Sequence, residues 1–225
     1  EITFLFNKAG TNNMPAQINS LCDDYDRNNI IIDSLRVIYN EQLECSPSDK
    51  RYTLVAGGRR SHLETLYDLC MNDDVLKKFN IGFCVGGMKK KDFETNNNNC
   101  DILLASYSFV NEGYDNPKLN TLFLLTPMSN ITQIVGRVLR TIHSVVPLII
   151  DINDISNYPF KPSFEKRIRF YKSKKYSIIY GNHLDLNIPS DDSDNSPNEN
   201  SDCPNVVQCN IKGESCLMSV DQFLL

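Results

Sequence analysis

The feature that most constrains the fold is a series of short apolar runs that alternate with helical patterns. The runs span residues 52–56, 81–85, 102–105, 121–125 and 145–152. Several of them are almost uninterrupted Leu, Ile and Val, which is typical of strands that helices cover on both faces. Helical patterns lie at 29–43, 61–71, 129–140 and 163–174. This alternation predicts an α/β fold in which helices flank a parallel sheet.

The segment 133–140 has the sequence Gln-Ile-Val-Gly-Arg-Val-Leu-Arg. On a helix, Gln133, Arg137 and Arg140 share one face because they are four and then three residues apart. No Asp or Glu within the segment neutralises the two guanidinium groups, and planar guanidinium groups bind phosphate in a bidentate manner. The pattern therefore indicates a site for an external polyphosphate or, more simply, a solvated basic helix face.

The segment 101–117 has the pattern of an apolar strand that opens into a polar loop and ends at a proline. Ligands of α/β proteins bind where parallel strands end. Gly113 permits a close approach of the backbone to a ligand, and the Asp115 carboxylate accepts hydrogen bonds such as those of a sugar hydroxyl. The alternative for Asp115 is a turn before Asn-Pro. The polar run 96–99, just before this strand, is predicted to be a surface loop.

Four segments in this order give the chain a specific resemblance. They are residues 54–63, 82–91, 106–117 and 133–140, followed by the apolar run 147–152. The chain resembles the C-terminal RecA-like lobe of superfamily 2 helicases, above all the poxvirus transcript-release DNA helicase and related viral and phage helicases. The resemblance extends over roughly residues 28–180 and implies a RecA-like fold.

The resemblance also implies catalytic and nucleotide-binding roles. Arg137 and Arg140 would close over the γ-phosphate of ATP as catalytic arginines, and Gln133 would help to position them. The residues implied to lie at the nucleotide or to pack tightly beside it are Gly113, Asp115 and Gly136. An arginine of this kind stabilises the charge on the phosphoryl group during its transfer.

Two motifs that such a motor needs are missing from the sequence. It contains no Gly-x-x-x-x-Gly-Lys-Ser/Thr phosphate loop and no Asp-Glu-x-Asp/His segment, which hold the phosphates and Mg2+. A preceding RecA-like lobe is therefore expected to bind most of the ATP and Mg2+. The segment alone is expected to be inactive.

Nucleic-acid contacts are predicted in three loops that follow strands. The residues are Arg59, Arg60, Gly86, Gly87, Lys89 and Ser106. The glycine pair would present backbone N–H groups to a phosphate, and the lysine run 89–91 would add charge. The resemblance places backbone contacts at Ser106 and at the arginine pair. The simpler alternatives are a glycine turn, a solvated charged face and a serine that caps its own loop.

Three segments are predicted to divide the chain. Residues 1–27 are expected to be a linker or strand from a preceding lobe, and residues 28–180 the RecA-like domain. Residues 181–225 are expected to be a largely disordered acidic tail, because they are poor in apolar surface. The tail holds eight acidic residues and one lysine, so residues 1–180 carry 22 Lys and Arg against 20 Asp and Glu. The net charge of −5 therefore does not exclude a nucleic-acid partner.

The sequence contains no run of eighteen apolar residues and no charged-then-apolar leader. It therefore predicts neither a membrane span nor a signal peptide. None of the eight cysteines forms a Cys-x-x-Cys pair, and the spacing of Cys203, Cys209 and Cys216 fits no common zinc pattern. We expect reduced thiols, no metal site, and a location inside the cell, in the host cytoplasm (a viral factory) or a virion.

The sequence thus predicts the second lobe of an ATP-dependent helicase that moves along and unwinds DNA or RNA. Its expected partners are the nucleic acid, the first lobe and a transcription or replication factor. Two alternatives remain open at this point: a non-catalytic nucleic-acid-binding or scaffold lobe, and a translocase that does not separate strands. A phosphate loop upstream would favour a motor over a scaffold, and an unwinding assay would separate helicase from translocase.

Overall fold

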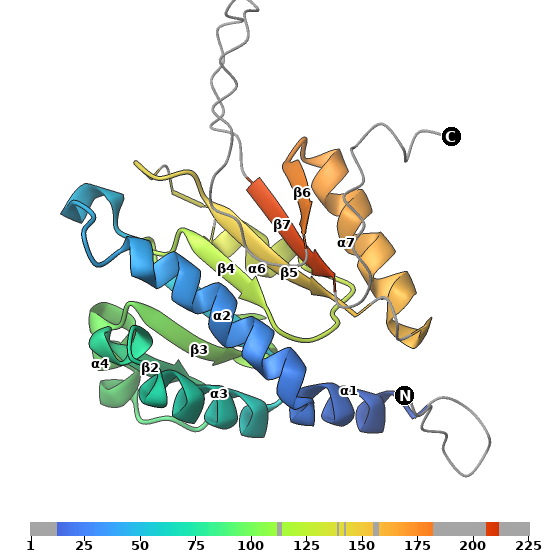
Figure 1. Cartoon of the computed structure of the whole chain (residues 1–225), viewed down its shortest axis with the longest axis horizontal. Coiled ribbons are helices and arrows are strands. Elements are labelled where there is room, and N and C mark those ends of the chain that lie inside the picture. Colours follow the sequence, from blue (N-terminus) through green and yellow to red (C-terminus); the bar gives the residue numbers. More distant parts are fainter. Residues whose placement is uncertain are drawn as a thin grey trace, which may run out of the picture.

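One parallel sheet organises the protein (Figure 1). The computed structural model describes residues 13–111, 114–138, 140–141, 143–154, 158–181 and 206–211. In these residues the strands lie in the order β2-β3-β1-β4-β5-β7-β6. The strands are β1 (Thr53–Gly57), β2 (Ile81–Cys84), β3 (Ile102–Ser106), β4 (Thr121–Leu124), β5 (Leu148–Asn153), β6 (Ser177–Gly181) and β7 (Val206–Ile211). All neighbouring pairs are parallel, so the predicted α/β, RecA-like class is confirmed.

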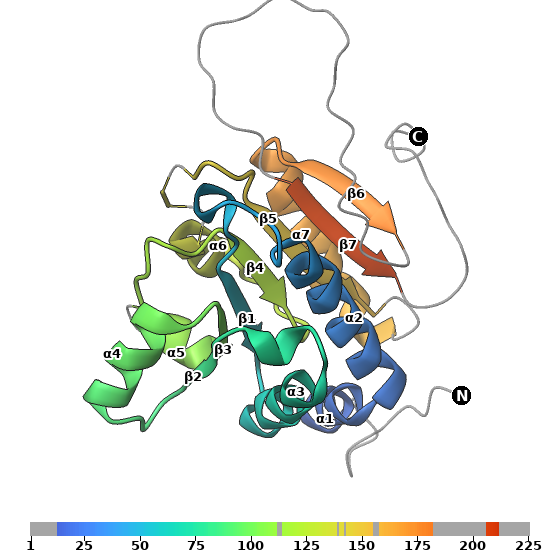
Figure 2. The same cartoon turned by 60° about the vertical axis from the view of Figure 1, so that its left-hand side comes forward.

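Helices cover both faces of the sheet (Figures 1 and 2). One face packs against α2 (Tyr25–Glu41) and α3 (Arg60–Asn72), and α1 (Met14–Asp23) precedes α2. The other face packs against α4 (Lys90–Asn99), α5 (Tyr107–Asn111), α6 (Thr132–Val138) and α7 (Lys161–Ser173). Short 3-10 turns lie at Pro47–Asp49, Leu76–Lys78 and Tyr158–Phe160.

Alternate strand residues enter the two apolar cores. In β1, Val55 belongs to the core under α2 and α3, whereas Leu54 and Ala56 belong to the opposite core. All three are fully buried. Two buried faces explain why the strands appear in the sequence as continuous apolar runs. The predicted strands are confirmed to within a few residues, and helix α6 is shorter than the predicted 129–140.

The chain leaves neighbouring strands toward opposite faces at the middle of the sheet. After β1 it enters α3 on one face, and after β4 it enters α6 on the other. Strands β1 and β4 are direct neighbours. Such a switch point opens a crevice at the carboxyl ends of the strands, where ligands of open α/β sheets bind.

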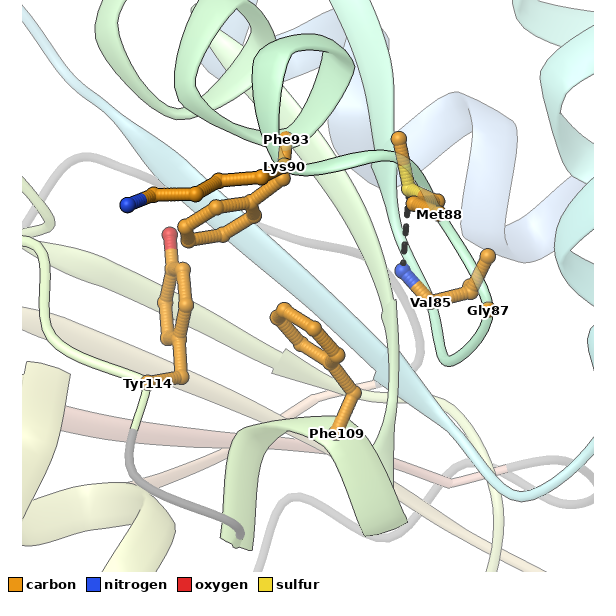
Figure 3. Close-up of a pocket in the computed structure, with 7 residues that line it drawn as sticks. All are labelled: Val85, Gly87, Met88, Lys90, Phe93, Phe109 and Tyr114. Atoms are coloured by element: carbon orange, nitrogen blue, oxygen red, sulfur yellow. Dashed lines mark hydrogen bonds between the residues drawn. The ribbon is translucent and has the colours of Figure 1, made fainter.

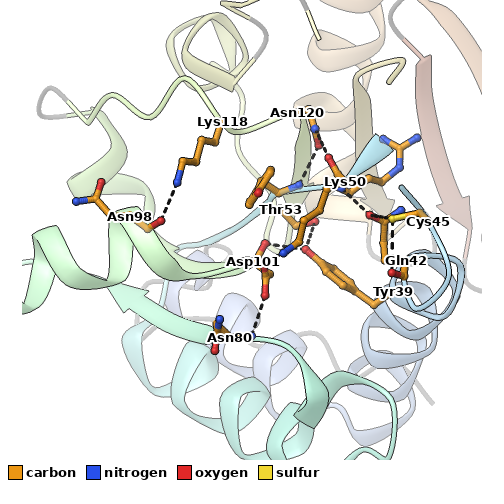
Figure 4. A network of polar contacts seen from close by, with 12 residues as sticks. Tyr39, Gln42, Cys45, Lys50, Thr53, Asn80, Asn98, Asp101, Lys118 and Asn120 are labelled. Atoms are coloured by element: carbon orange, nitrogen blue, oxygen red, sulfur yellow. Dashed lines mark hydrogen bonds and ion pairs between the residues drawn. The ribbon is translucent and has the colours of Figure 1, made fainter. Parts of the chain in front are cut away.

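The amino edge of the sheet is closed by its own polar contacts (Figure 4). The Tyr39 hydroxyl donates to Asp101 O at 2.7 Å and lies 2.9 Å from Thr53 Oγ1. The Asp101 carboxylate pairs with Lys50 Nζ at 2.8 Å and accepts from Asn80 N at 3.0 Å. These bonds join α2 to the starts of β1, β2 and β3, so this edge has a structural role.

Helices occupy part of the segment predicted to be a linker or strand. The Asn13 side chain accepts from Ala16 N at 3.2 Å and caps α1, which has Pro15 in its first turn. The Asp24 side chain accepts from Arg27 N at 2.9 Å and caps α2. Two N-caps therefore start helices where the prediction had a strand or linker. Residues 1–12 lie outside the described residues, and a preceding lobe stays a prediction.

The tail predicted to be largely disordered contains a strand. Strand β7 inserts between β5 and β6 and is parallel to both. Its sequence, Val-Val-Gln-Cys-Asn-Ile, contains three β-branched residues, which favour strands. Residues 182–205 and 212–225, which include Cys203 and Cys216, lie outside the described residues.

The polar run 96–99, predicted to be a loop, forms the last turns of α4. Its polar groups are used to dock the helix: Asn96 Nδ2 donates to Phe83 O and Asn116 Nδ2 donates to Asn97 O, both at 2.9 Å. The helix also touches the backbone of β2. A Cβ atom on Gly82 would lie 2.6 Å from Cys100 Sγ, which is closer than side-chain atoms approach. Tertiary docking thus overrides the weak helix propensity of asparagine.

Candidate functional site

Several of the predicted functional residues lie at the carboxyl edge of the sheet. Gly58 and Arg59 follow β1, Gly86 and Gly87 follow β2, and Ser106 ends β3. Across the switch point, Gly58 N donates to Thr126 Oγ1 at 3.0 Å. The sheet therefore brings together segments that are up to about 70 residues apart in the sequence, as expected for parallel strands whose ends meet at one edge.

The two motif arginines both contact the segment after α5. Arg137 Nη1 donates to Tyr114 O at 2.7 Å, and its Nη2 donates to Asn111 O at 3.1 Å. Arg140 Nη1 pairs with Asp115 Oδ2 at 2.8 Å. The structure thus joins Arg137 and Arg140 to the loop that the sequence placed at the same site.

The environments of the two arginines differ. Arg137 is half-buried, and two backbone carbonyls fix its guanidinium fork. The side chain of Arg140 is 65% exposed and that of Asp115 is 54% exposed. No acidic partner of the arginines was visible within residues 133–140, but Asp115 supplies one from 25 residues upstream. Exposed ion pairs of this kind are weak, so an incoming anion can replace the carboxylate.

The other residues of the predicted nucleotide site are Gln133, Gly136 and Gly113. Gln133 and Gly136 are exposed on α6, and among the described residues no atom outside the helix backbone and the chain neighbours lies within 4 Å of a Cβ built on Gly136. This face of α6 is open in the described part of the chain, and the predicted packing role of Gly136 stays a prediction. Gly113 lies outside the described residues, and its predicted role stays a prediction.

Ser106 has a local structural role at the end of β3. Its hydroxyl accepts weakly from Phe109 N at 3.4 Å and lies 3.2 Å from Ser108 Oγ. It therefore caps the short helix α5, which was the simpler alternative from the sequence. The residue is still partly exposed at the edge of the sheet, so capping leaves room for a ligand contact.

The arginine pair after β1 is engaged within the chain. Arg59 Nε donates to Asn19 Oδ1 at 2.8 Å, which ties the loop to α1. Arg60 pairs with Glu64 at 3.0 Å across one turn of α3, and both side chains are exposed. Only Arg60 is free to change its partner at little cost, whereas release of Arg59 would undo a contact with α1.

The turn after β2 is the most open part of this edge. Gly87 has φ +82°, a left-handed conformation that favours glycine. Among the described residues, no atom other than those of the chain neighbours lies within 4 Å of a Cβ built on Gly86 or Gly87. Lys89 follows at the start of α4 and is exposed. A phosphate can therefore approach this backbone without displacing a side chain.

A buried charged cluster that no sequence motif predicted lies beside the switch point. Arg27 Nε pairs with Asp154 Oδ1 at 2.8 Å, and Arg27 Nη2 also donates to Leu125 O. Beside them, His62 Nε2 bonds Asn28 Oδ1 at 2.8 Å. Burial, and then the nearby Arg27 charge, lower the pKa of His62 to about 4. His62 is therefore a neutral structural residue at physiological pH.

A second buried cluster lies under α7. Arg167 Nε pairs with Asp151 Oδ2 at 2.7 Å, and the Tyr171 hydroxyl donates to the same oxygen at 2.9 Å. Burial opposes the charge on Arg167, but the Asp151 carboxylate and two tyrosines outweigh it and raise the pKa of Arg167. This cluster fastens α7 to β5. Within the described residues, no group of His, Cys, Asp or Glu side chains could hold a metal ion.

Similarity to known proteins adds evidence of a different kind. Over 126 residues the chain is 36% identical to a protein of Acanthamoeba polyphaga mimivirus named "Putative ATP-dependent RNA helicase". The match covers 56% of the chain and 24% of the mimivirus protein, so the chain spans about a quarter of the length of that relative.

The chain was also compared with solved structures and with models of protein families. The chain matches the crystal structure of T4 UvsW with a TM-score of 0.49 and 19% identity, over 72% of this chain and 35% of that one. No model of a protein family matches it. The predicted closeness to poxvirus helicases stays a prediction. In the described part of the chain, every helix is too short or too polar to cross a membrane.

Proposed function

We propose that this chain is the second lobe of an ATP-dependent superfamily 2 helicase. The Arg140–Asp115 ion pair is the observation that carries the proposal. It joins the arginine motif to the loop after β3, and both side chains are more than half exposed. Homology to the mimivirus protein named as a helicase supports the same class.

In this proposal Arg140 is the arginine that reaches the γ-phosphate. When the first lobe presents ATP, the phosphate replaces the Asp115 carboxylate as the partner of Arg140. The released Asp115 is then available to a ribose hydroxyl. An arginine that stabilises the transferring phosphoryl group accelerates hydrolysis by about 10³–10⁵.

Arg137 has a supporting part in the same scheme. Its two carbonyl partners, Tyr114 O and Asn111 O, hold α6 against the segment after α5. It therefore sets the position of Arg140 and reaches the phosphate only if these bonds open. Gln133, exposed on the same helix, is placed to contact the phosphate or the first lobe.

ATP and Mg2+ would be held mainly by the first lobe. The chain has no phosphate loop and no acidic Mg2+ motif of its own, and the described residues include no cluster that fits a metal. Mg2+ would neutralise the phosphate charge when it is bound. This chain would contribute the arginines that face the phosphates, and the chain alone should not hydrolyse ATP.

The nucleic-acid side of the site is proposed at the open turn after β2 and at Ser106. Gly86, Gly87 and Lys89 present backbone N–H groups and charge, which suit phosphates. Ser106 ends β3 and Asp115 follows α5, so α5 lies between the proposed nucleic-acid contact and the proposed nucleotide contact. A shift of α5 on ATP binding would move both contacts together. A two-state element that both ligands bias couples the two sites.

The proposal is tested with the chain extended upstream to include the first lobe. Arg140→Ala should reduce nucleic-acid-stimulated ATP hydrolysis by at least about 100-fold, while ATP binding is retained. Arg169, which is exposed on α7, provides a matched control, and Arg169→Ala should leave the rate unchanged. An unchanged rate in Arg140→Ala would contradict the proposal.

Further outcomes separate the alternatives. If wild type binds nucleic acid but never hydrolyses ATP, the lobe is a scaffold. If it hydrolyses ATP without separating a duplex, it is a translocase. The name of the mimivirus relative makes RNA the first nucleic acid to compare with DNA, and its viral source supports the proposal that the chain acts in the cytoplasm of an infected cell or in a virion.

A further inference from the structure

A pocket between α4 and α5 has no role in the scheme above (Figure 3). Its volume is about 340 Å³. It is lined by Val85, Gly87, Met88, Lys90, Phe93, Phe109 and Tyr114. These residues come from the turn after β2, from α4, from α5 and from the segment that follows α5. The pocket therefore adjoins the open glycine turn at the carboxyl edge of the sheet.

Three aromatic rings form the walls of this pocket. The ring centroids of Phe93 and Phe109 are 5.4 Å apart, those of Phe109 and Tyr114 are 5.8 Å apart, and those of Phe93 and Tyr114 are 6.1 Å apart. The rings are tilted or edge-on to one another, and no two of them stack face to face. Phe93 and Phe109 are partly exposed. A flat apolar group can therefore find a ring face here.

The pocket also contains a buried hydroxyl, whose pKa is raised by burial and lowered in part by the Asn116 side chain. Tyr114 is 4% exposed, and its hydroxyl makes no hydrogen bond of normal geometry with the described residues. The neighbouring Asn116 is engaged elsewhere, since its amide donates to Asn97 and its Oδ1 accepts from Lys118 N. Figure 3 shows the Tyr114 hydroxyl directed toward the Lys90 side chain.

Positive charge lies on the α4 side of the pocket. Lys90 lines it, and Lys89 and Lys91 flank Lys90 in the chain; all three are exposed. Lys90 is only loosely paired with Glu94, at 3.8 Å. The backbone at Gly86 and Gly87 is open to an approaching group. An aromatic pocket with cations and free backbone at its rim suits a flat base that is attached to a phosphate.

We propose that this pocket accepts one unstacked nucleobase of a single-stranded nucleic acid. The base stacks on the aromatic rings, and the adjoining phosphate lies at Lys90 and the glycine turn. Stacking on aromatic side chains is the usual, sequence-tolerant way in which proteins hold single strands. This inference rests on the proposed function, because it assigns a base contact to the proposed phosphate track.

The test compares two labelled oligomers of about 12 nucleotides, a length within the range of known single-strand sites. One is oligothymidylate, and the other carries abasic sites on the same phosphate backbone. By fluorescence anisotropy, the wild-type chain should bind the base-bearing oligomer more tightly. Phe109→Leu keeps an apolar side chain but removes the ring, and should weaken oligothymidylate binding by at least about fivefold without changing abasic binding.

Matched controls separate stacking from charge and from damage to the fold. Phe83→Leu removes a partly buried ring that packs on Tyr67 on the opposite face of the sheet, and should leave both affinities unchanged. Lys90→Gln should weaken both oligomers equally, and more than Lys91→Gln does, because only Lys90 lines the pocket. Circular dichroism confirms that each variant is folded.

A measurement on the wild type covers the case in which Phe109→Leu does not fold. An oligomer with 5-iodouracil, irradiated in the complex, should cross-link to Phe93, Phe109 or Tyr114, and a cross-link only elsewhere overturns the inference. Equal binding of both oligomers by wild type also overturns it, leaves the proposed phosphate contacts intact, and points to another occupant such as a partner's aromatic side chain. Binding of neither oligomer rejects the inference and the nucleic-acid part of the proposed function together.

Discussion

Two arginine–aspartate pairs of the same length have opposite surroundings. The N–O distance is 2.8 Å in both Arg27–Asp154 and Arg140–Asp115. The side chains of the first pair are 1% and 4% exposed, and those of the second are 65% and 54% exposed. Burial makes the loss of one partner costly, whereas solvent lets partners exchange. The comparison shows that burial, rather than the pairing itself, separates the structural arginine from the one that is available to a ligand.

The largest expected effect is at the buried pair. Arg27→Met leaves the Asp154 carboxylate buried without its cation, and should lower the free energy of unfolding by about 3–5 kcal/mol. Urea denaturation followed by circular dichroism measures the loss. The double variant Arg27→Met/Asp154→Leu should recover much of the stability, because no charge then remains buried. A loss below about 1 kcal/mol in the single variant, which is the range of surface pairs, would show that the buried pair stabilises the fold no more than an exposed pair does.

A smaller effect on the free energy of unfolding is expected when the pH is lowered. This effect arises from protonation of His62, which lies beside Arg27. The pKa of His62 is about 4 in the folded chain against 6.5 ordinarily. Its contribution to stability is therefore present above pH 6.5 and is lost as the pH falls toward 4. At pH 5 the loss relative to neutral pH should be about 2 kcal/mol. His62→Gln should lack this component in urea denaturation at the two pH values; an identical pH dependence in both proteins would show that His62 is not buried beside a cation.

The smallest effect on stability is expected at the exposed pair. Arg140→Ala should change the free energy of unfolding by less than about 1 kcal/mol, measured by urea denaturation. The same variant should nevertheless lose at least about 100-fold in the rate of nucleic-acid-stimulated ATP hydrolysis. High salt should remove even the small stability difference, because solvent-exposed charges are screened. A loss of several kcal/mol would mean that Arg140 is structural and would remove it as a ligand for phosphate.

The sheet and the meeting of the two motifs could be read from the sequence. Apolar runs located the strands because both faces of a parallel sheet are buried, and the resemblance to helicases implied that Asp115 and Arg140 share one site. The partners of Arg137 could not be read, since both are backbone carbonyls whose positions depend on the fold. The Arg27–Asp154 pair joins residues that are 127 apart in the sequence. No local sequence pattern predicts such a pair. The caps Asn13 and Asp24 were readable signals that the linker prediction missed.

The close contact at Gly82 limits how this chain can vary. Because any Cβ there would press on Cys100 and Asn96, most single-nucleotide changes at this codon would push α4 away from β2. The same helix carries Phe93 and Lys90 to the aromatic pocket. A position with no ligand contact therefore controls the spacing of the pocket walls, and mutational drift at Gly82 would damage the pocket even when all its lining residues are retained.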